Sequence, residues 1–120
     1  MVANTPRTRK TKGQEFQKKV VKKFRERFNF DADLDDCFVG DIQANPMGQS
    51  SVDVKLSPKA QLFIPFDIEC KRVEKLNIWS ALDQAEANTG KGRIPLVVFK
   101  KNRSKTYAVI ELDKLLYLMD

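Results

Sequence analysis

The sequence contains no histidine and only two cysteines, and these shortages exclude several kinds of site. Without histidine there can be no zinc site of the Cys/His type, no Ser-His or Cys-His nucleophile pair, and no histidine general base. Cys37 and Cys70 are too few for a disulfide framework and form no CxxC pattern, so we expect both to be reduced. Any catalysis must therefore use carboxylates, lysine and a hard metal ion.

Long hydrophobic runs are also missing, which bears on location. No run approaches the length of a membrane span, and the start MVANTPRTRK lacks the apolar segment of a signal peptide. We therefore expect no membrane partner and a cytoplasmic location. At 120 residues, with 42% hydrophobic and 32% charged residues, the chain suits one globular domain. We predict a flexible basic arm over residues 1–12 and a single domain over residues 13–120.

The net charge of +6 is concentrated near the N-terminus. Residues 1–27 hold ten Lys and Arg against two Glu, whereas residues 28–120 hold 12 basic and 14 acidic residues. A basic segment of this kind suits a polyanion, because phosphate contacts supply affinity that does not depend on sequence. A solubilising tail is the alternative interpretation.

Hydrophobic periodicity predicts an α/β fold with a mixed central sheet flanked by helices. Apolar residues recur every four positions over residues 13–29, which indicates a first helix with one core face. Residues 51–56 and 62–71 alternate as strands do, residues 77–89 form a helical pattern before Gly90, and the apolar run 94–99 is typical of a strand buried on both faces. A last strand, 106–112, and a short helix, 113–119, follow. A helical crossover allows the third strand to lie parallel to its neighbour.

Asp53, Glu69 and Lys71 are the candidate site. If the first two strands form an antiparallel hairpin centred near Gln61, position 53 falls opposite position 69. Side chains two apart in a strand share a face, so Glu69 and Lys71 project together while Cys70 points the other way.

Two interpretations fit this trio of charges. Two carboxylates beside a lysine can hold a magnesium ion, lower the pKa of a bound water and stabilise the charge of a phosphodiester under attack. Alternatively, Lys71 forms a cross-strand salt bridge with Asp53 or Glu69 on an exposed face, as surface charges commonly do. Residue spacing alone does not separate the two.

Four separated segments carry a resemblance that favours the first interpretation: MGQSSVDVKLSP, IPFDIECK, VEKLNIWSALDQAEAN and PLVVFKKNRSKTYAVIEL. Over residues 13–119 the chain resembles the PD-(D/E)xK nuclease superfamily and, more narrowly, small phage-encoded Holliday junction resolvases. The resemblance implies a restriction-endonuclease-like core and a cytoplasmic location in the host cell. Its activity would be the resolution of four-way junctions by phosphodiester hydrolysis, dependent on Mg²⁺ or Mn²⁺.

The resemblance also implies a role for individual residues. Asp53 and Glu69 match the metal ligands, the backbone carbonyl of Cys70 matches a further ligand, and Lys71 matches the catalytic lysine. Glu15 matches a glutamate on the first helix that completes the metal site; the alternative is an ion pair with Lys19.

A glutamine that orders the site corresponds to Gln84, for which an ordinary exposed polar residue is the alternative. Two departures from the family pattern are Ser51, where a glycine is common, and Asp67, which shares a strand face with Glu69. Three roles are open for Asp67: an extra ligand, a partner for a lysine, or none. Trp79 is expected in the core or an interface.

The implied partner is branched double-stranded DNA, cut by a homodimer because resolution requires paired cuts. One candidate for the apolar interface is the closing LLYLM segment together with residues of the 77–89 helix. Candidate DNA-binding residues are Lys10, Lys12, Lys18, Lys22, Lys100, Lys101, Arg103 and Lys105.

Two further interpretations of the function stay open, and one interpretation of an acidic segment fails. The same site would also suit flaps, single strands or restriction-like cutting, and a non-catalytic nucleic-acid-binding protein is possible if the three charges form only a salt bridge. Asp31, Asp33 and Asp35 imitate a calcium loop, but the required glycine is Asp36 and the twelfth position is Ile42, so we expect a solvated acidic loop.

Overall fold

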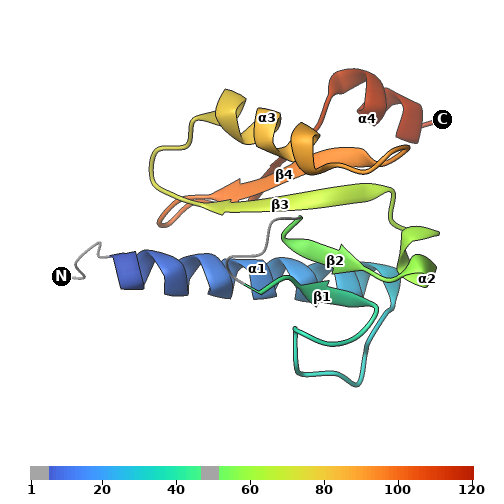
Figure 1. Cartoon of the computed structure of the whole chain (residues 1–120), viewed down its shortest axis with the longest axis horizontal. Coiled ribbons are helices and arrows are strands. Elements are labelled where there is room, and N and C mark those ends of the chain that lie inside the picture. Colours follow the sequence, from blue (N-terminus) through green and yellow to red (C-terminus); the bar gives the residue numbers. More distant parts are fainter. Residues whose placement is uncertain (1–5, 47–51) are drawn as a thin grey trace.

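The computed structural model describes residues 6–46 and 52–120, and it is an α/β fold with helices on both faces of one mixed sheet (Figure 1). The elements, in chain order, are α1 (Pro6–Phe28), β1 (Ile42–Ala44), β2 (Val54–Leu56), α2 (Pro58–Gln61), β3 (Phe66–Arg72), α3 (Ile78–Asn88), β4 (Ile94–Lys100), β5 (Tyr107–Val109) and α4 (Leu112–Leu118). The α/β class and the mixed sheet confirm that part of the sequence prediction. None of the helices within the described ranges is long and apolar enough to cross a membrane.

The five strands lie in chain order across the sheet, β1-β2-β3-β4-β5. All neighbours are antiparallel except β3 and β4, which are parallel, as the helical crossover predicts. Val54 pairs with Ile68, and the backbone N–H of Asp53, just before β2, donates to the carbonyl of Ile68. The side chains of Asp53 and Glu69 interact, so the predicted proximity of these two residues is confirmed.

The two faces of the sheet are packed differently. The main core lies between the sheet and α1, where Phe16, Val20 and Val21 belong to one hydrophobic cluster with Ile42 and Ile68 of the sheet. The opposite face packs α3 through small residues, Ala81 and Ala85, against Val97. Small side chains bring α3 close to the sheet, so its polar side chains can reach β3.

Helix α1 begins at Pro6 rather than near residue 13, so the predicted disordered arm is wrong for residues 6–12; residues 1–5 lie outside the described residues. Proline is tolerated at the first helical position, and lysine and arginine are good helix formers. A search for apolar periodicity does not find this helical segment, because the sequence of residues 6–12 has no repeating apolar positions.

The segment between the main helix and β2 also differs from the prediction. The strand β1 was not predicted, and β2 begins at Val54, so Ser51 lies outside the described residues and Val52–Asp53 precede the strand. The predicted hairpin loop contains the short helix α2, whose first turn is capped by Ser57 accepting from the backbone N–H of Ala60. The register is unaffected because β2 and β3 still pair about the same centre.

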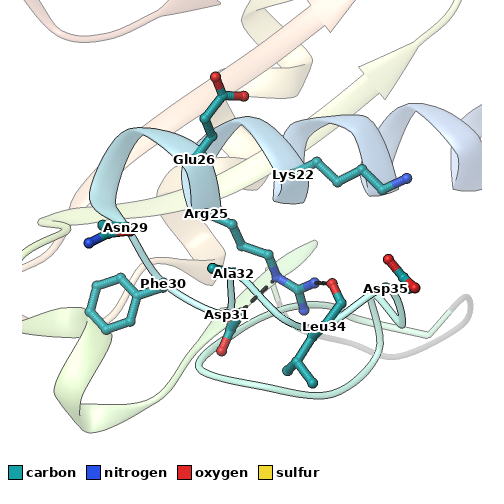
Figure 2. Close-up of a pocket in the computed structure, with 9 residues that line it drawn as sticks. All are labelled: Lys22, Arg25, Glu26, Asn29, Phe30, Asp31, Ala32, Leu34 and Asp35. Atoms are coloured by element: carbon teal, nitrogen blue, oxygen red, sulfur yellow. Dashed lines mark hydrogen bonds and ion pairs between the residues drawn. The ribbon is translucent and has the colours of Figure 1, made fainter.

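Arg25 anchors the acidic loop after α1, whose sequence imitates a calcium loop (Figure 2). This buried guanidinium donates to the backbone carbonyl of Ile42 and lies 3.3 Å from the carboxylate of Asp31. Further bonds run to the carbonyls of Leu34, Asp36 and Val39. Asp31 is thus neutralised by an arginine, and Asp33 and Asp35 are exposed, as a solvated acidic loop requires.

Two apolar regions stay exposed. Every residue of α4 is exposed, including Leu112, Leu116 and Tyr117. Trp79, on the first turn of α3, is 76% exposed, so the prediction that it packs in the core is wrong. The alternative prediction, an interface role, stays open.

Candidate functional site

Asp53 is held where the chain enters β2. Its backbone N–H donates to the carbonyl of Ile68 over 3.0 Å, and its carboxylate Oδ2 accepts from the backbone N–H of Cys70 over 2.6 Å. Gln17 of α1, 4% exposed, donates its side-chain amide to the carbonyls of Asn45 and Asp53. The backbone and carboxylate of Asp53 are therefore both fixed by the strand and helix beside them.

Glu69 is a carboxyl group buried in the sheet, 2% exposed. Its Oε1 accepts a hydrogen bond from Nδ2 of Asn88, at the end of α3, over 2.9 Å, and the carboxyl also interacts with the Asp53 carboxyl and with the charge of Lys71. Burial raises the pKa of Glu69 to about 7, with the charge of Asp53 adding to the rise and Asn88 and Lys71 opposing it. Two adjacent carboxyls, one of them desolvated, form a site that favours either a proton or a cation between them.

Lys71 lies on the same face of β3 as Glu69 and reaches α3. Its Nζ donates to Oε1 of Gln84 over 2.6 Å. Among the residues described, Lys71 takes part in none of the ion pairs, so the cross-strand salt bridge of the alternative interpretation is not formed. Gln84, which the resemblance assigns to ordering the site, therefore bonds to Lys71.

Cys70 points away from this pair. Its side chain packs against the core on the α1 side, and burial raises the pKa of its thiol well above the ordinary value. Because the N–H and C=O of one strand residue point to the same side, the Cys70 carbonyl faces the side of Asp53, where its N–H already bonds. This carbonyl is the one to which the resemblance assigns the role of a backbone ligand.

Glu15 is not part of the site. It lies on the exposed side of α1 and pairs with Lys18 over 3.6 Å, one residue before the lysine considered as its partner. No group of three or more Cys, Asp or Glu side chains able to hold a metal occurs in the described part of the chain. Glu15 faces away from the site because of helix geometry: Gln17, two positions on, occupies the buried face of α1 toward Asp53.

Asp67 has a structural role. Its carboxylate accepts from the backbone N–H of Gly90 over 2.9 Å and pairs with Nε of Arg93 over 3.0 Å. These bonds tie the start of β3 to the loop between α3 and β4. Its partner is thus an arginine rather than the lysine considered from the sequence.

The eight predicted DNA-binding residues fall into two groups. One end of the molecule carries the N-terminal half of α1 and the turn between β4 and β5 (Figure 1), with Lys10, Lys12, Lys100, Lys101, Arg103 and Lys105. Lys12 is near enough to Glu74, after β3, to lower the pKa of that exposed carboxyl, although Asn102 is the larger cause. Lys18 and Lys22 lie farther along α1, where Lys18 covers the ring of Phe38.

Lys22 borders a hollow of about 410 Å³ at the C-terminal end of α1 (Figure 2). The hollow is lined by both signs of charge, with Arg25 already paired to Asp31, and it shares no residue with the Asp53–Glu69 pair. It therefore belongs to the loop anchor rather than to the candidate site.

Two residues of the site were missed in the sequence. Asn88 lies one helical turn after Gln84 and so shares its face, a spacing that was available as a signal. Gln17 is a polar residue on the core face of α1, next to Phe16. Its neighbours give no sign that it bonds to backbone carbonyls, since these come from a distant segment.

Comparison of the chain with models of protein families, with curated proteins and with solved structures finds no match.

Proposed function

We propose that this protein is a metal-dependent, structure-selective DNA endonuclease that resolves four-way junctions by phosphodiester hydrolysis. The observation that carries the proposal is the buried carboxyl of Glu69 beside Asp53, with Lys71 on the same face and free of an ion pair to either one among the residues described. Burying a carboxyl costs free energy unless a partner compensates it. A metal ion bound between the two carboxyl groups would supply this compensation.

The donor set suits Mg²⁺ or Mn²⁺. Carboxylate and carbonyl oxygens are hard ligands, and Asp53, Glu69 and the carbonyl of Cys70 supply them. Mg²⁺ usually binds through one or two carboxylates, several waters and substrate phosphates, so a third carboxylate is not needed. A bound ion would polarise the phosphate and lower the pKa of a water molecule.

The surrounding residues position this chemistry. Asn88 orients the carboxylate of Glu69, and the backbone N–H of Cys70 orients that of Asp53. Gln84 holds the ammonium of Lys71, which can orient the attacking water or stabilise charge on the phosphate. Water is excluded from the pair on the sheet side because Glu69 is buried.

The fold and the charge distribution support a nuclease of the restriction-endonuclease-like type. Of the proposed ligands, Asp53 immediately precedes β2 and the other two lie on β3, its antiparallel neighbour, while the crossover helix α3 supplies the side chains that bond to Glu69 and Lys71. The basic end formed by α1 and the β4–β5 turn suits the phosphates of a DNA arm. A junction is recognised by shape and phosphate positions, for which dispersed lysines suffice.

We further propose a homodimer, since resolving a junction requires two cuts related by a two-fold axis. Leu112, Leu115 and Leu116 of the exposed α4, with Met119 directly after it, recur at helical spacing and form the candidate interface. Leu116→Glu is expected to shift the protein to monomers in sedimentation velocity without changing its circular dichroism spectrum.

The test is cleavage of a labelled four-way junction in Mg²⁺, beside a linear duplex, a flap and a single strand of the same sequence. We expect paired symmetric nicks in the junction, absent in Glu69→Gln and Asp53→Asn. Asp31→Asn is the matched control, because it removes a buried carboxylate that lies outside the proposed site.

The other outcomes distinguish the alternatives. Cutting spread over flap or single strand identifies a broader PD-(D/E)xK-type nuclease. Binding without cleavage in Mg²⁺ and Mn²⁺ favours a non-catalytic nucleic-acid-binding protein.

A further inference from the structure

A second hollow lies on the same face of the sheet as Lys71. Register pairs Lys71 with Phe99 across β3 and β4, and Phe99 with Tyr107 across β4 and β5. Paired residues share a face, so these three side chains form a row across the sheet, and neighbouring strands are about 4.8 Å apart. The two aromatic rings therefore lie one and two strands away from the proposed catalytic lysine.

These rings form one wall of a hollow of about 210 Å³. Their centroids are 6.1 Å apart and their planes are tilted by 31°. Tyr107 is 55% exposed, whereas Phe99 is partly buried and packs against the cluster formed by Ala81 and Ala85 of α3 and Val97 of β4. The apolar lining comes from Val73, Leu76, Phe99 and Tyr107.

The rim of this hollow is cationic. Lys100 and Lys101 line it directly. The only carboxylate among the lining residues is that of Glu74, and it is already bonded to Arg72 and to the backbone N–H of Asn102. An aromatic wall beside lysine side chains is the pattern that binds nucleotides of single strands, because bases stack on the rings and phosphates contact the lysines.

We propose that this hollow holds an unpaired nucleobase next to the phosphate that Lys71 contacts. The volume lies below the range of about 300–1,000 Å³ typical of drug-sized ligands, so it suits one flat ring rather than a base pair. The inference rests on the proposed nuclease function for its place in the reaction, and it specifies the substrate as DNA with an unstacked nucleotide at the cut. Base identity is not selected, because stacking accepts every base.

The test measures binding in EDTA, so it does not depend on cleavage. The probes are a short labelled oligodeoxythymidylate and a strand of equal length made of abasic sites, which keeps the phosphates and removes the bases. We expect the wild-type protein to bind the base-bearing strand at least about fivefold more tightly in fluorescence anisotropy, because stacking one base is worth about 1–3 kcal/mol.

Three variants locate the effect. Tyr107→Leu, which keeps apolar area but removes the ring, should abolish the preference, and Tyr107→Phe should retain it. Trp79→Leu is the matched control, since Trp79 is an exposed aromatic residue that does not line the hollow, and it should leave the preference unchanged. Thermal unfolding of each variant checks that the fold is intact.

Equal binding of the two strands by the wild-type protein would overturn the proposal, as would loss of the preference in Trp79→Leu instead of Tyr107→Leu. A protein that shows the stacking preference but cuts no DNA in Mg²⁺ would contradict only the nuclease function. The two failures are therefore distinguishable.

Discussion

Asp31 and Glu69 are two poorly exposed carboxyls that the fold treats in opposite ways. The side chain of Asp31 lies 3.3 Å from the Arg25 guanidinium and accepts from the backbone N–H groups of Asp41 and Ile42. Gly40 leaves it room, because a Cβ there would lie 2.8 Å from the carboxylate. Glu69 has the neutral amide of Asn88 and faces another carboxyl.

The difference separates a structural acid from a candidate functional one. The charge of Asp31 is matched by an arginine and by oriented N–H groups, so ionisation is compensated within the protein. The raised pKa of Glu69 shows that its ionisation is not fully compensated. The charge of Lys71 compensates Glu69 only in part, and a cation from solution can complete such a site.

The largest expected effect on stability comes from removing Arg25, the counter-charge of Asp31. Arg25→Met leaves Asp31 buried without a counter-charge and removes donors from several loop carbonyls, so we expect a loss of about 3–5 kcal/mol in the free energy of unfolding. Urea denaturation followed by circular dichroism measures it. Arg27→Met is the control on the same helix, exposed and stacked only on Phe28, and should change stability by less than about 1 kcal/mol. Equal effects of the two changes would contradict the anchoring role.

The second prediction concerns pH and the uncompensated acid in EDTA. Because the folded pKa of Glu69 is raised from 4.5 to about 7, the folded state holds this proton more tightly than the unfolded state. The group's stabilising contribution is complete below pH 4.5 and is lost as the pH rises through 7. Glu69→Gln should thus match wild type near pH 4.5 and exceed it at pH 8 by about 2–3 kcal/mol.

The measurement is the difference in free energy of unfolding between the two proteins across this range. Acids that do not interact with position 69 cancel in that difference, whereas Asp53 titrates together with Glu69 and contributes to it. A difference that stays constant with pH would contradict the assignment of the titration to Glu69.

The third prediction sharpens the comparison with a metal. At pH 8, Mg²⁺ at ten times its dissociation constant should raise the free energy of unfolding of the wild-type protein by about 1.4 kcal/mol. Asp53→Asn should lose this gain, while Asp31→Asn, although less stable, should keep it. Isothermal calorimetry of Mg²⁺ with each protein gives the same ranking, and an equal gain in Asp53→Asn would place the ion elsewhere.

The smallest expected effect concerns Asn88. Removing its hydrogen bond to Glu69 should weaken Mg²⁺ binding by about 1 kcal/mol, roughly fivefold, because the carboxylate loses its orientation. Gln84→Ala is the matched control on the same helix, since Gln84 bonds to Lys71, and it should leave Mg²⁺ affinity unchanged while lowering the cleavage rate. Similar Mg²⁺ affinities for Asn88→Ala and wild type would remove Asn88 from the site.

Local pattern was sufficient to predict the elements whose hydrophobic period is strong, and with them the central pair of the site. The helix capped by Asn77, the apolar strand after it and the proximity of Asp53 and Glu69 follow from periodicity and from counting along a hairpin. The insertion of α2 did not disturb the pairing of β2 with β3, because equal offsets on both strands preserve it.

Long-range contacts decided the rest. Whether Glu15 or Gln17 faces Asp53 depends on how α1 rotates against the sheet, which is settled by the packing of Phe16 and Val20. The pairing of Asp31 with Arg25, and the distance from Asn88 to Glu69, join segments that are unrelated in sequence pattern. Sequence by itself thus determined which residue types share a strand face, since that alternation is a local property of the backbone. Tertiary structure alone decided which of the buried acids has a counter-charge, because the partners come from distant segments.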